Sequence, residues 1–453
     1  MLKTTIFLMF ILGFAHGGVL NMPRQSSLDN VKSDWGYVTV RDDAHMFWWL
    51  FFQDPSYQPS FLTAIDPVPV VVWMQGGPGA SGTGYGNFEE LGPLDLDMNR
   101  RETSWTGLAH VLFVDNPVGS GYSYVSNTNA YTTDIDQIAA DMVALLKGFY
   151  GKHPELTANP FYIFCESYGG KMAAATALAL SKEIEAGNMN INLQGVGLGD
   201  GWISPMDSVN TWGEYLYETG LLDDTGLTAV NNAAQATQNA VNNGDWTRAT
   251  NLWSLTESVV IRNTDNVDFY DILAPHHATT EYLIKTRNLT RLVPEELATG
   301  YALNVESYST DPLDALMNGE VKTYLGIPDS VVWGGQSNAV FNAQAGDFMK
   351  PVIDTVDQLI NTGMKVLVYN GQLDLIVDTP GQEQWMKKMQ WSDLSSFMGK
   401  NWTPRYAAKG EDTGGFSKKL DNFQFWWVLK AGHMVPADAG EFMLYMLHDV
   451  ITA

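Results

Sequence analysis

Short apolar runs alternate with longer segments of helical periodicity along most of the chain. Apolar residues recur every three or four positions at 135–149, which predicts an amphipathic helix. A second helix is predicted at 172–184, which is rich in alanine and leucine and lacks proline and glycine. Strands are predicted at 36–40, 46–52, 68–74, 110–114, 161–165, 193–198, 365–369 and 423–429. This alternation is typical of an α/β fold in which helices cover both faces of a mostly parallel sheet.

The middle of the chain has a different pattern. Strand signals fade from 204 to 332, and 229–250 is rich in Ala, Asn, Gln and Thr with helical potential. Because sheet-like runs resume at 365, we interpret 204–332 as a mainly helical lid inserted into a core formed by 18–203 and 333–453. A separately folding helical domain is the alternative.

The first residues indicate the compartment. Lys3 precedes an apolar run at 6–14 and then small residues, which predicts a secretory signal peptide at 1–17. The run is shorter than the roughly 20 residues that span a bilayer, and we expect no membrane span elsewhere. A secreted or lysosomal protein is therefore expected, with N-glycosylation sequons at Asn288 and Asn401.

Composition narrows the function classes. The 453 residues include 45 % hydrophobic residues, and 51 acidic against 26 basic residues give a net charge of −25. Such a charge repels phosphate backbones and excludes a nucleic-acid-binding role. Cys165 is the only cysteine, so neither an internal disulfide nor a cysteine metal cluster forms. We expect no metal or cofactor; the oligomeric state is left open.

The sharpest chemical motif surrounds Ser167. A predicted strand at 161–165 is followed by Glu166-Ser167-Tyr168-Gly169-Gly170 and a helix, as in the nucleophile elbow of α/β-hydrolases. Cys165 replaces the usual first glycine of the turn. A thiol nucleophile at Cys165 is the alternative, but lone cysteines are mostly buried and inert, and Ser167 holds the apex.

An elbow serine needs an acid and then a histidine later in the chain. Asp374 follows the strand predicted at 365–369, and we regard the nearby Asp378 as a decoy. His433 lies in a Gly- and Pro-bracketed loop after the last predicted strand, whereas His448 lies in a helical run and is expected at the surface. The sequence thus predicts Ser167, Asp374 and His433 as a catalytic triad.

A glycine-rich loop, Gln75-Gly76-Gly77-Pro78-Gly79, follows the strand predicted at 68–74. It lacks the Lys-Ser/Thr of a phosphate-binding P-loop. A plain tight turn is one interpretation. Together with the elbow, we favour an oxyanion hole formed by the N–H groups of Gly77 and Tyr168.

Six blocks in order resemble the serine carboxypeptidase family, which has the α/β-hydrolase fold. They begin at Gln75 (QGGPG), Asn116 (NPVGSGYSY), Glu166 (ESYGG), Gly199 (GDGWISP), Asn370 (NGQLD) and Gly432 (GHMVP). The blocks cover most of the chain after the signal segment. Family members commonly have Asn where Gln75 stands, and many have a disulfide cysteine where Ala80 stands.

The resemblance implies removal of C-terminal residues from peptides with a free C-terminus, through a Ser167 acyl-enzyme at acidic pH. It implies that Gln75, Gly76, Glu90 and Glu166 hold the substrate carboxylate, the two glutamic acids sharing a proton. Met434 would line the leaving-residue side. An acyltransferase or esterase with the same triad, and a lumenal scaffold with little turnover, are the alternatives.

Overall fold

The structure is a computed structural model that describes residues 26–274, 312–406 and 412–452. The predicted signal peptide and the sequon at Asn288 lie outside these residues.

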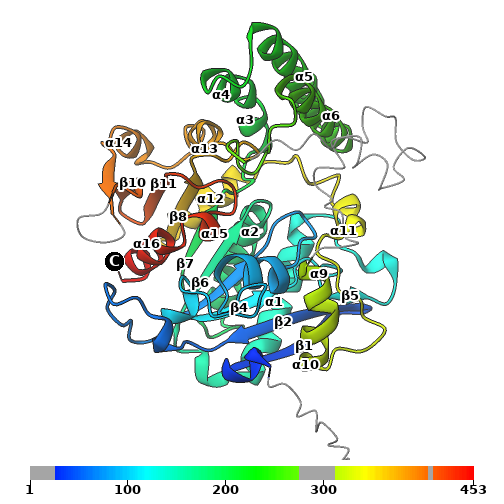
Figure 1. Cartoon of the computed structure of the whole chain (residues 1–453), viewed down its shortest axis with the longest axis vertical. Helices are drawn as coiled ribbons and strands as arrows, with labels where there is room; N and C mark the ends of the chain where they lie inside the picture. Colours follow the sequence, from blue (N-terminus) through cyan, green and yellow to red (C-terminus); the bar gives the residue numbers. More distant parts are fainter. Residues whose placement is uncertain (1–25, 275–311, 407–411, 453) are drawn as a thin grey trace, which may run out of the picture.

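The described residues form an eleven-stranded sheet through the centre of the molecule (Figure 1). Along the sheet the order is β1-β2-β4-β3-β6-β7-β8-β11-β10-β9, and β5 pairs with β2. The six strands from β4 to β11 in this order are parallel, and the pairs at both edges are antiparallel. The bounds are β1 (Ser33–Arg41), β2 (Ala44–Phe51), β3 (Val70–Met74), β4 (His110–Val114), β5 (Tyr124–Val125), β6 (Pro160–Glu166), β7 (Asn192–Gly199), β8 (Lys365–Gly371), β9 (Thr403–Arg405), β10 (Gly415–Leu420) and β11 (Phe423–Val428).

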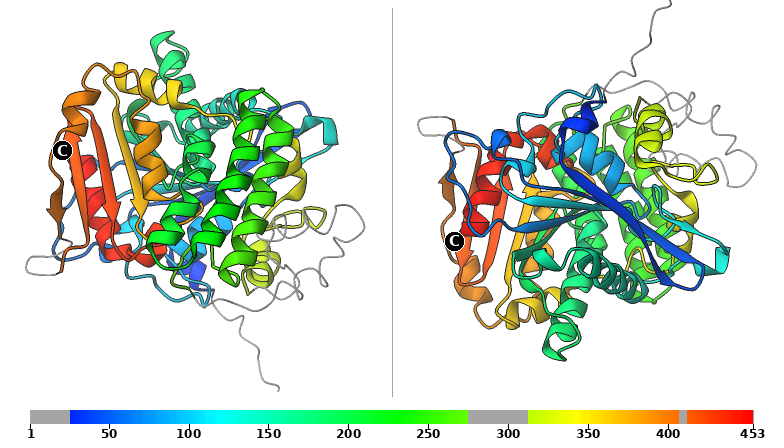
Figure 2. Two further views of the ribbon diagram at one scale, coloured as in Figure 1. Left: turned by 90° about the horizontal axis from the view of Figure 1, so that it is seen from above. Right: turned by 90° about the horizontal axis from the view of Figure 1, so that it is seen from below.

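Both faces of the central strands are buried, as their apolar residues predict. Along β3, Val70 and Val72 point into one hydrophobic core and Val71 and Trp73 into the other. The first core is covered by α1 (Ile135–Lys152), α2 (Gly169–Glu185) and α12 (Ile353–Asn361). The second is covered by α16 (Gly440–Thr452). The predicted α/β arrangement, with helices on both faces, is thereby confirmed (Figure 2).

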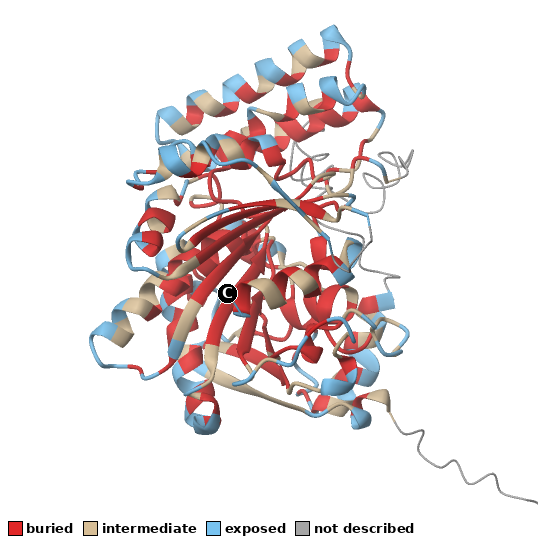
Figure 3. Ribbon diagram, turned by 90° about the vertical axis from the view of Figure 1, so that its left-hand side faces the viewer, coloured by how far each residue is buried: buried red, intermediate tan, exposed pale blue. Residues whose placement is uncertain are grey.

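The described part of 204–332 is helical and contains no strand. Its two long helices, α5 (Asp224–Asn242) and α6 (Trp246–Thr264), pack as a hairpin above the sheet with an exposed outer surface (Figure 3). The polar run at 229–250 is divided between them because the chain turns at Gly244, which has a φ of +69°. The division of the chain into core and lid stays a prediction.

The shorter helices of the described chain connect these layers. They are α3 (Pro205–Val209), α4 (Trp212–Glu218), α9 (Pro312–Leu316), α10 (Lys322–Leu325), α11 (Asn338–Ala343), α13 (Thr379–Met386), α14 (Leu394–Met398) and α15 (Val435–Asp438). None of the described helices has both the length and the apolar character that a membrane crossing requires.

Candidate active site

The three predicted triad residues meet at the carboxyl edge of the parallel strands. Ser167 follows β6, Asp374 lies three residues after β8, and His433 lies in the loop between β11 and α15. Parallel strands end at the same edge, so residues far apart in the sequence converge there.

The backbone at Ser167 is a strained elbow. Ser167 has a φ of +62°, a left-handed conformation that is uncommon outside glycine. Three hydrogen bonds hold the turn: Ser167 N–H donates to Gly199 O at 3.1 Å, and Ser167 O accepts from Trp202 N–H at 2.9 Å and from Gly170 N–H at 2.8 Å. The elbow therefore projects the Ser167 side chain out of the sheet edge and into a cavity.

Cys165 lies beneath this turn and points away from the cavity. Its side chain is fully buried, and Sγ donates a hydrogen bond to Gly197 O at 3.2 Å. Burial raises the pKa of the thiol to about 12, which opposes thiolate formation. The position normally taken by a glycine thus accommodates a side chain that packs into the core.

His433 and Asp374 form a buried pair. His433 Nδ1 lies 2.7 Å from Asp374 Oδ2, and Asp374 Oδ1 accepts the Val377 N–H at 3.1 Å. The histidine loop is fixed by Gly432 N–H, which donates to Asp438 Oδ2 at 2.7 Å. Among the described residues, His433 Nε2 has no hydrogen-bond partner. It is available to accept a proton from a group in the cavity.

The acid and the histidine that were not assigned to the triad, Asp378 and His448, lie outside the cavity. Asp378 caps α13 by accepting the Gly381 N–H, and it also accepts a hydrogen bond from Thr211. His448 lies on α16 and bonds to Thr63 Oγ1 at 3.0 Å. Neither residue lines the cavity.

The cavity in front of the pair has a volume of about 230 Å³. One side is polar and includes Ser167 and His433, and Met434 also lines it. The apolar wall comes from α6 and from loops at the sheet edge. Its members are Trp202, Trp253, Phe348 and Ile376.

The glycine-rich loop after β3 passes directly beside the nucleophile. A Cβ at Gly76 would lie 2.5 Å from Ser167 Cβ, so only glycine fits there. Gly77 has a φ of +103°, which glycine alone adopts readily. Among the described residues, the N–H groups of Gly77 and Tyr168 donate no hydrogen bond. The two predicted oxyanion donors are therefore unpaired beside the elbow.

A buried polar cluster closes the end of the cavity that Gln75 and Glu166 line. Gln75 Nε2 donates to Glu90 Oε1 at 2.9 Å and to Glu166 Oε1 at 3.0 Å. Glu90 comes from the π-helical segment η3 (Gly82–Leu91) and is fully buried. Burial raises the pKa of both carboxyls, and the Glu90 charge raises that of Glu166 further. The remaining oxygens, Glu90 Oε2 and Glu166 Oε2, have no other donor among the described residues, which favours one proton shared between them.

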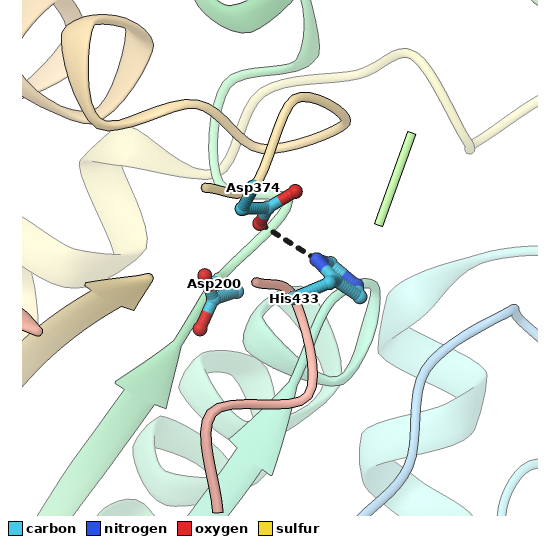
Figure 4. A group of neighbouring side chains, drawn as sticks. All are labelled: Asp200, Asp374 and His433. Carbon is cyan, nitrogen blue, oxygen red and sulfur yellow. Dashed lines mark hydrogen bonds and ion pairs between the residues drawn. The ribbon is translucent and has the colours of Figure 1, made fainter. Parts of the chain in front are cut away.

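A third carboxyl, Asp200, lies immediately beyond β7. Single ligand atoms of Asp200, Asp374 and His433 all lie within 4.8 Å of one another, and Figure 4 shows Asp200 beside the bonded pair. This spacing alone suits a metal ion. In the structure, however, Nδ1 of His433 and Oδ2 of Asp374 are bonded to each other.

The helix that follows the elbow is tied to the apolar wall by a buried ion pair. Lys171 Nζ lies 2.7 Å from Asp347 Oδ2, and both side chains are almost fully buried. Tyr168 OH donates to the same Asp347 oxygen at 3.0 Å. Asp347 adjoins Phe348, whose ring stacks on that of Tyr168 at 5.9 Å between centroids.

Sequence reasoning missed the roles of Asp200, Trp73 and Asp347. Asp200 could have been identified from the sequence, because it follows a predicted strand just as Asp374 does. Trp73 Nε1 donates to Gln75 Oε1 at 2.7 Å. Gln75 is the first residue after β3, and nothing in the sequence distinguishes this contact between residues two positions apart from many others. The contact between Asp347 and Lys171 joins positions 176 residues apart, for which no local signal exists.

Comparisons with known proteins agree on one family. Residues 23–453 match the family model described as serine carboxypeptidase. The retinoid-inducible serine carboxypeptidase of Rattus norvegicus is 48 % identical over 98 % of this chain and 96 % of its own, and the Homo sapiens protein is 46 % identical over the same shares. Serine carboxypeptidase-like 51 of Arabidopsis thaliana is 38 % identical over 99 % of both chains. Among solved structures, the prohormone-processing carboxypeptidase Kex1Δp of Saccharomyces cerevisiae matches with a TM-score of 0.74 at 18 % identity, covering 93 % of this chain and 91 % of its own.

Proposed function

Because this chain belongs to the serine carboxypeptidase family, we propose that Ser167, His433 and Asp374 carry its hydrolytic activity by an acyl-enzyme route on peptides with a free C-terminus. The observation that supports this most strongly is that one cavity brings the elbow serine and His433 together with the Gln75 and Glu166 side chains. The serine and histidine supply the chemistry, and the amide and carboxyl supply a place for a terminal carboxylate.

In the first step, Ser167 Oγ attacks the scissile carbonyl carbon while its proton passes to His433 Nε2. Asp374 holds the imidazole by accepting the Nδ1–H and stabilises the positive charge that develops. His433 then gives that proton to the leaving amine, and the C–N bond breaks. Water, activated by His433, hydrolyses the ester and restores Ser167.

The tetrahedral intermediates carry a negative oxygen in front of Gly77 and Tyr168. The unpaired N–H groups of Gly77 and Tyr168 are held rigidly by the glycine loop and by the start of α2, so these donors need no reorganisation as the charge forms. Met434, which is partly exposed at the cavity, borders the leaving residue.

Gln75, Gly76, Glu90 and Glu166 bind the carboxylate of the substrate. With one shared proton, the pair of glutamic acids becomes a hydrogen-bond donor and repels the substrate anion less. Binding is therefore strongest at low pH and weakens as the pair loses its proton. His433 must be neutral to accept the serine proton, which favours higher pH. We infer a mildly acidic optimum, about pH 4.5–6, between the usual carboxyl and imidazole values.

The chain is proposed to enter the secretory pathway through the signal peptide at 1–17 and to be secreted or lysosomal. A glycan on Asn401 is compatible with its exposed position between α14 and β9.

The test uses a fluorophosphonate probe and a peptide library. The probe should form an adduct on Ser167 of the wild type, and mass spectrometry should show loss of single C-terminal residues from peptide acids. Labelling of Ser167 with no shortening of any peptide would exclude carboxypeptidase activity and favour ester chemistry. Absence of labelling would overturn the nucleophile assignment.

A further inference from the structure

Asp200 is a buried carboxyl that the acyl-enzyme route leaves without a role. It is almost fully shielded from solvent and lies at the end of β7, beside the pair formed by Asp374 and His433 (Figure 4). Its Oδ1 accepts the Gly371 N–H at 2.9 Å, whereas its Oδ2 is buried and has no partner among the described residues. A buried carboxylate oxygen with no donor is costly, and such a group usually keeps its proton.

Two buried carboxyls this close cannot both be ionised without strong repulsion. Asp374 accepts two hydrogen bonds, from the His433 ring and from Val377 N–H. Asp200 accepts one. The proton shared by these two carboxyls is therefore expected on Asp200.

The surroundings of Asp200 point the same way. The titratable groups that face it from the neighbouring elements are Asp374, Asp438, Glu166, Cys165, Tyr369 and His433, and none is a lysine or arginine. Burial raises the pKa of Asp200 well above its usual value, and the Asp374 charge raises it further.

We propose that Asp200 is a positioning residue that remains protonated and donates a hydrogen bond from Oδ2 to the Asp374 carboxylate. This rests on the proposed triad. The donated bond fixes the orientation of Asp374, so that its other interactions align the His433 ring. The neutral state of Asp200 also leaves a single negative charge behind His433, which then releases its proton to the leaving group more readily than it would beside two charges.

Asp200→Asn is the decisive variant. An asparagine keeps a donor and an acceptor in the same places, and it tolerates the φ of +41° at this position. If Asp200 is neutral in the wild type, this variant removes no charge. We expect kcat within about threefold of wild type and the acidic limb of kcat/KM within about 0.2 pH unit. A move of that limb to lower pH by about half a unit or more would show that Asp200 is ionised and would overturn the proposal.

Asp200→Gly removes the donor while suiting the left-handed backbone. We expect kcat to fall about 10- to 100-fold with KM changed less than about twofold, because the alignment of the base is lost. Full kcat in a folded Asp200→Gly protein would overturn the positioning role. Asp378→Asn, a matched change at a buried carboxyl that caps α13, should leave kcat and the pH profile unchanged.

An infrared difference spectrum makes the test independent of turnover and of whether the glycine variant folds. At about pH 6, above the usual Asp value of 3.8, wild type minus Asp200→Asn should show the C=O stretch of an un-ionised carboxylic acid. A carboxylate band in its place would overturn the proposal while leaving the triad assignment intact. If Ser167→Ala kept its activity, the proposed function would fail whatever the spectrum showed.

Discussion

Trp73 Nε1 donates a hydrogen bond to Gln75 Oε1 at 2.7 Å, and this contact determines which end of the Gln75 amide faces the two glutamic acids. An indole nitrogen can only donate, so the oxygen of the amide must point toward Trp73. The NH₂ group is then directed to Glu90 and Glu166, both of which accept from it. The cluster proposed to bind the substrate carboxylate is therefore oriented by a residue that lies inside the sheet.

We predict from this relationship that Trp73→Phe weakens the binding of peptide acids. Loss of one buried hydrogen bond removes about 1–1.5 kcal/mol of stabilisation, which should raise KM about 5- to 10-fold with a smaller change in kcat. Steady-state kinetics with a peptide acid and its C-terminal amide would measure the change in KM and kcat. Because the amide has no carboxylate to bind, its kinetic constants should change much less; equal effects on both substrates would point to general loss of packing instead.

A second prediction concerns the triad. Ser167→Ala and His433→Ala should each lower kcat by about 10⁴-fold or more, and the double variant should be no worse than either single one because both residues serve one step. His448→Ala is the matched control, since His448 lies on α16 and bonds to Thr63. Melting temperatures within a few degrees of wild type would confirm folding. More than about a tenth of wild-type activity in Ser167→Ala would contradict the assignment.

The third prediction is that the preference for a peptide acid over its amide declines between about pH 5 and pH 8. The pair Glu90 and Glu166 keeps its shared proton to higher pH than an ordinary carboxyl does, because burial raises the pKa of both, and the preference declines as that proton is lost. The ratio of kcat/KM for the two substrates is the measurement. Glu90→Gln with Glu166→Gln should flatten its pH dependence, and an unchanged ratio in the wild type would exclude the shared-proton clamp.

The same two carboxyls also predict how stability depends on pH. A carboxyl whose pKa is raised on folding keeps its proton longer in the folded state than in the unfolded chain. Its contribution to stability is complete below the usual value of 4.5 and is lost as pH rises through the folded value. The melting temperature of the wild type should therefore fall from pH 5 toward pH 8, and the double Gln variant should lose less. A wild type that melts higher at pH 8, with the variant unaffected, would contradict this.

A fifth prediction addresses Cys165. With its thiol pKa raised to about 12 and its side chain buried, it should react with thiol reagents only on unfolding. Cys165→Ala should keep wild-type kcat and lose about 1–2 kcal/mol of unfolding free energy, since a small buried group is removed. Labelling rates in native and denaturing buffer would test the first point and denaturant titration the second. A folded but inactive alanine variant would show that the thiol takes part in catalysis.

Much of the fold could be predicted because the strands of the central sheet are buried on both faces. Val70–Met74 is apolar throughout and Phe423–Val428 is apolar except at Gln424, and each predicted strand coincides with one in the structure to within three residues. The strands β5, β9 and β10 were not predicted. β5 has only two residues, β9 contains Pro404, and β10 carries Lys418 and Lys419. These strands form by pairing near the edges of the sheet and lack the continuous apolar run by which a strand is recognised in the sequence.

Part of the candidate site could also be predicted from the sequence, and part could not. Ser167, Asp374 and His433 each follow a recognisable strand, so chain order and the sheet edge were enough to bring them together. Asp200 also follows a strand, but its closeness to Asp374 depends on β7 and β8 being neighbours in the sheet. No local pattern encodes which strands pair. The apolar residues that form one wall of the cavity belong to no recognisable sequence motif.

The buried pair of Lys171 and Asp347 has a consequence for how a substrate fits. It joins α2, the helix that follows the nucleophile, to the segment carrying Phe348, and Tyr168 reinforces this connection by its hydrogen bond to Asp347 and its stacking on Phe348. To widen the cavity on this side, a substrate would have to separate two desolvated charges, which costs about 3–5 kcal/mol. We therefore expect the width of the apolar pocket to be set when the chain folds, so that a substrate residue too bulky for it binds poorly.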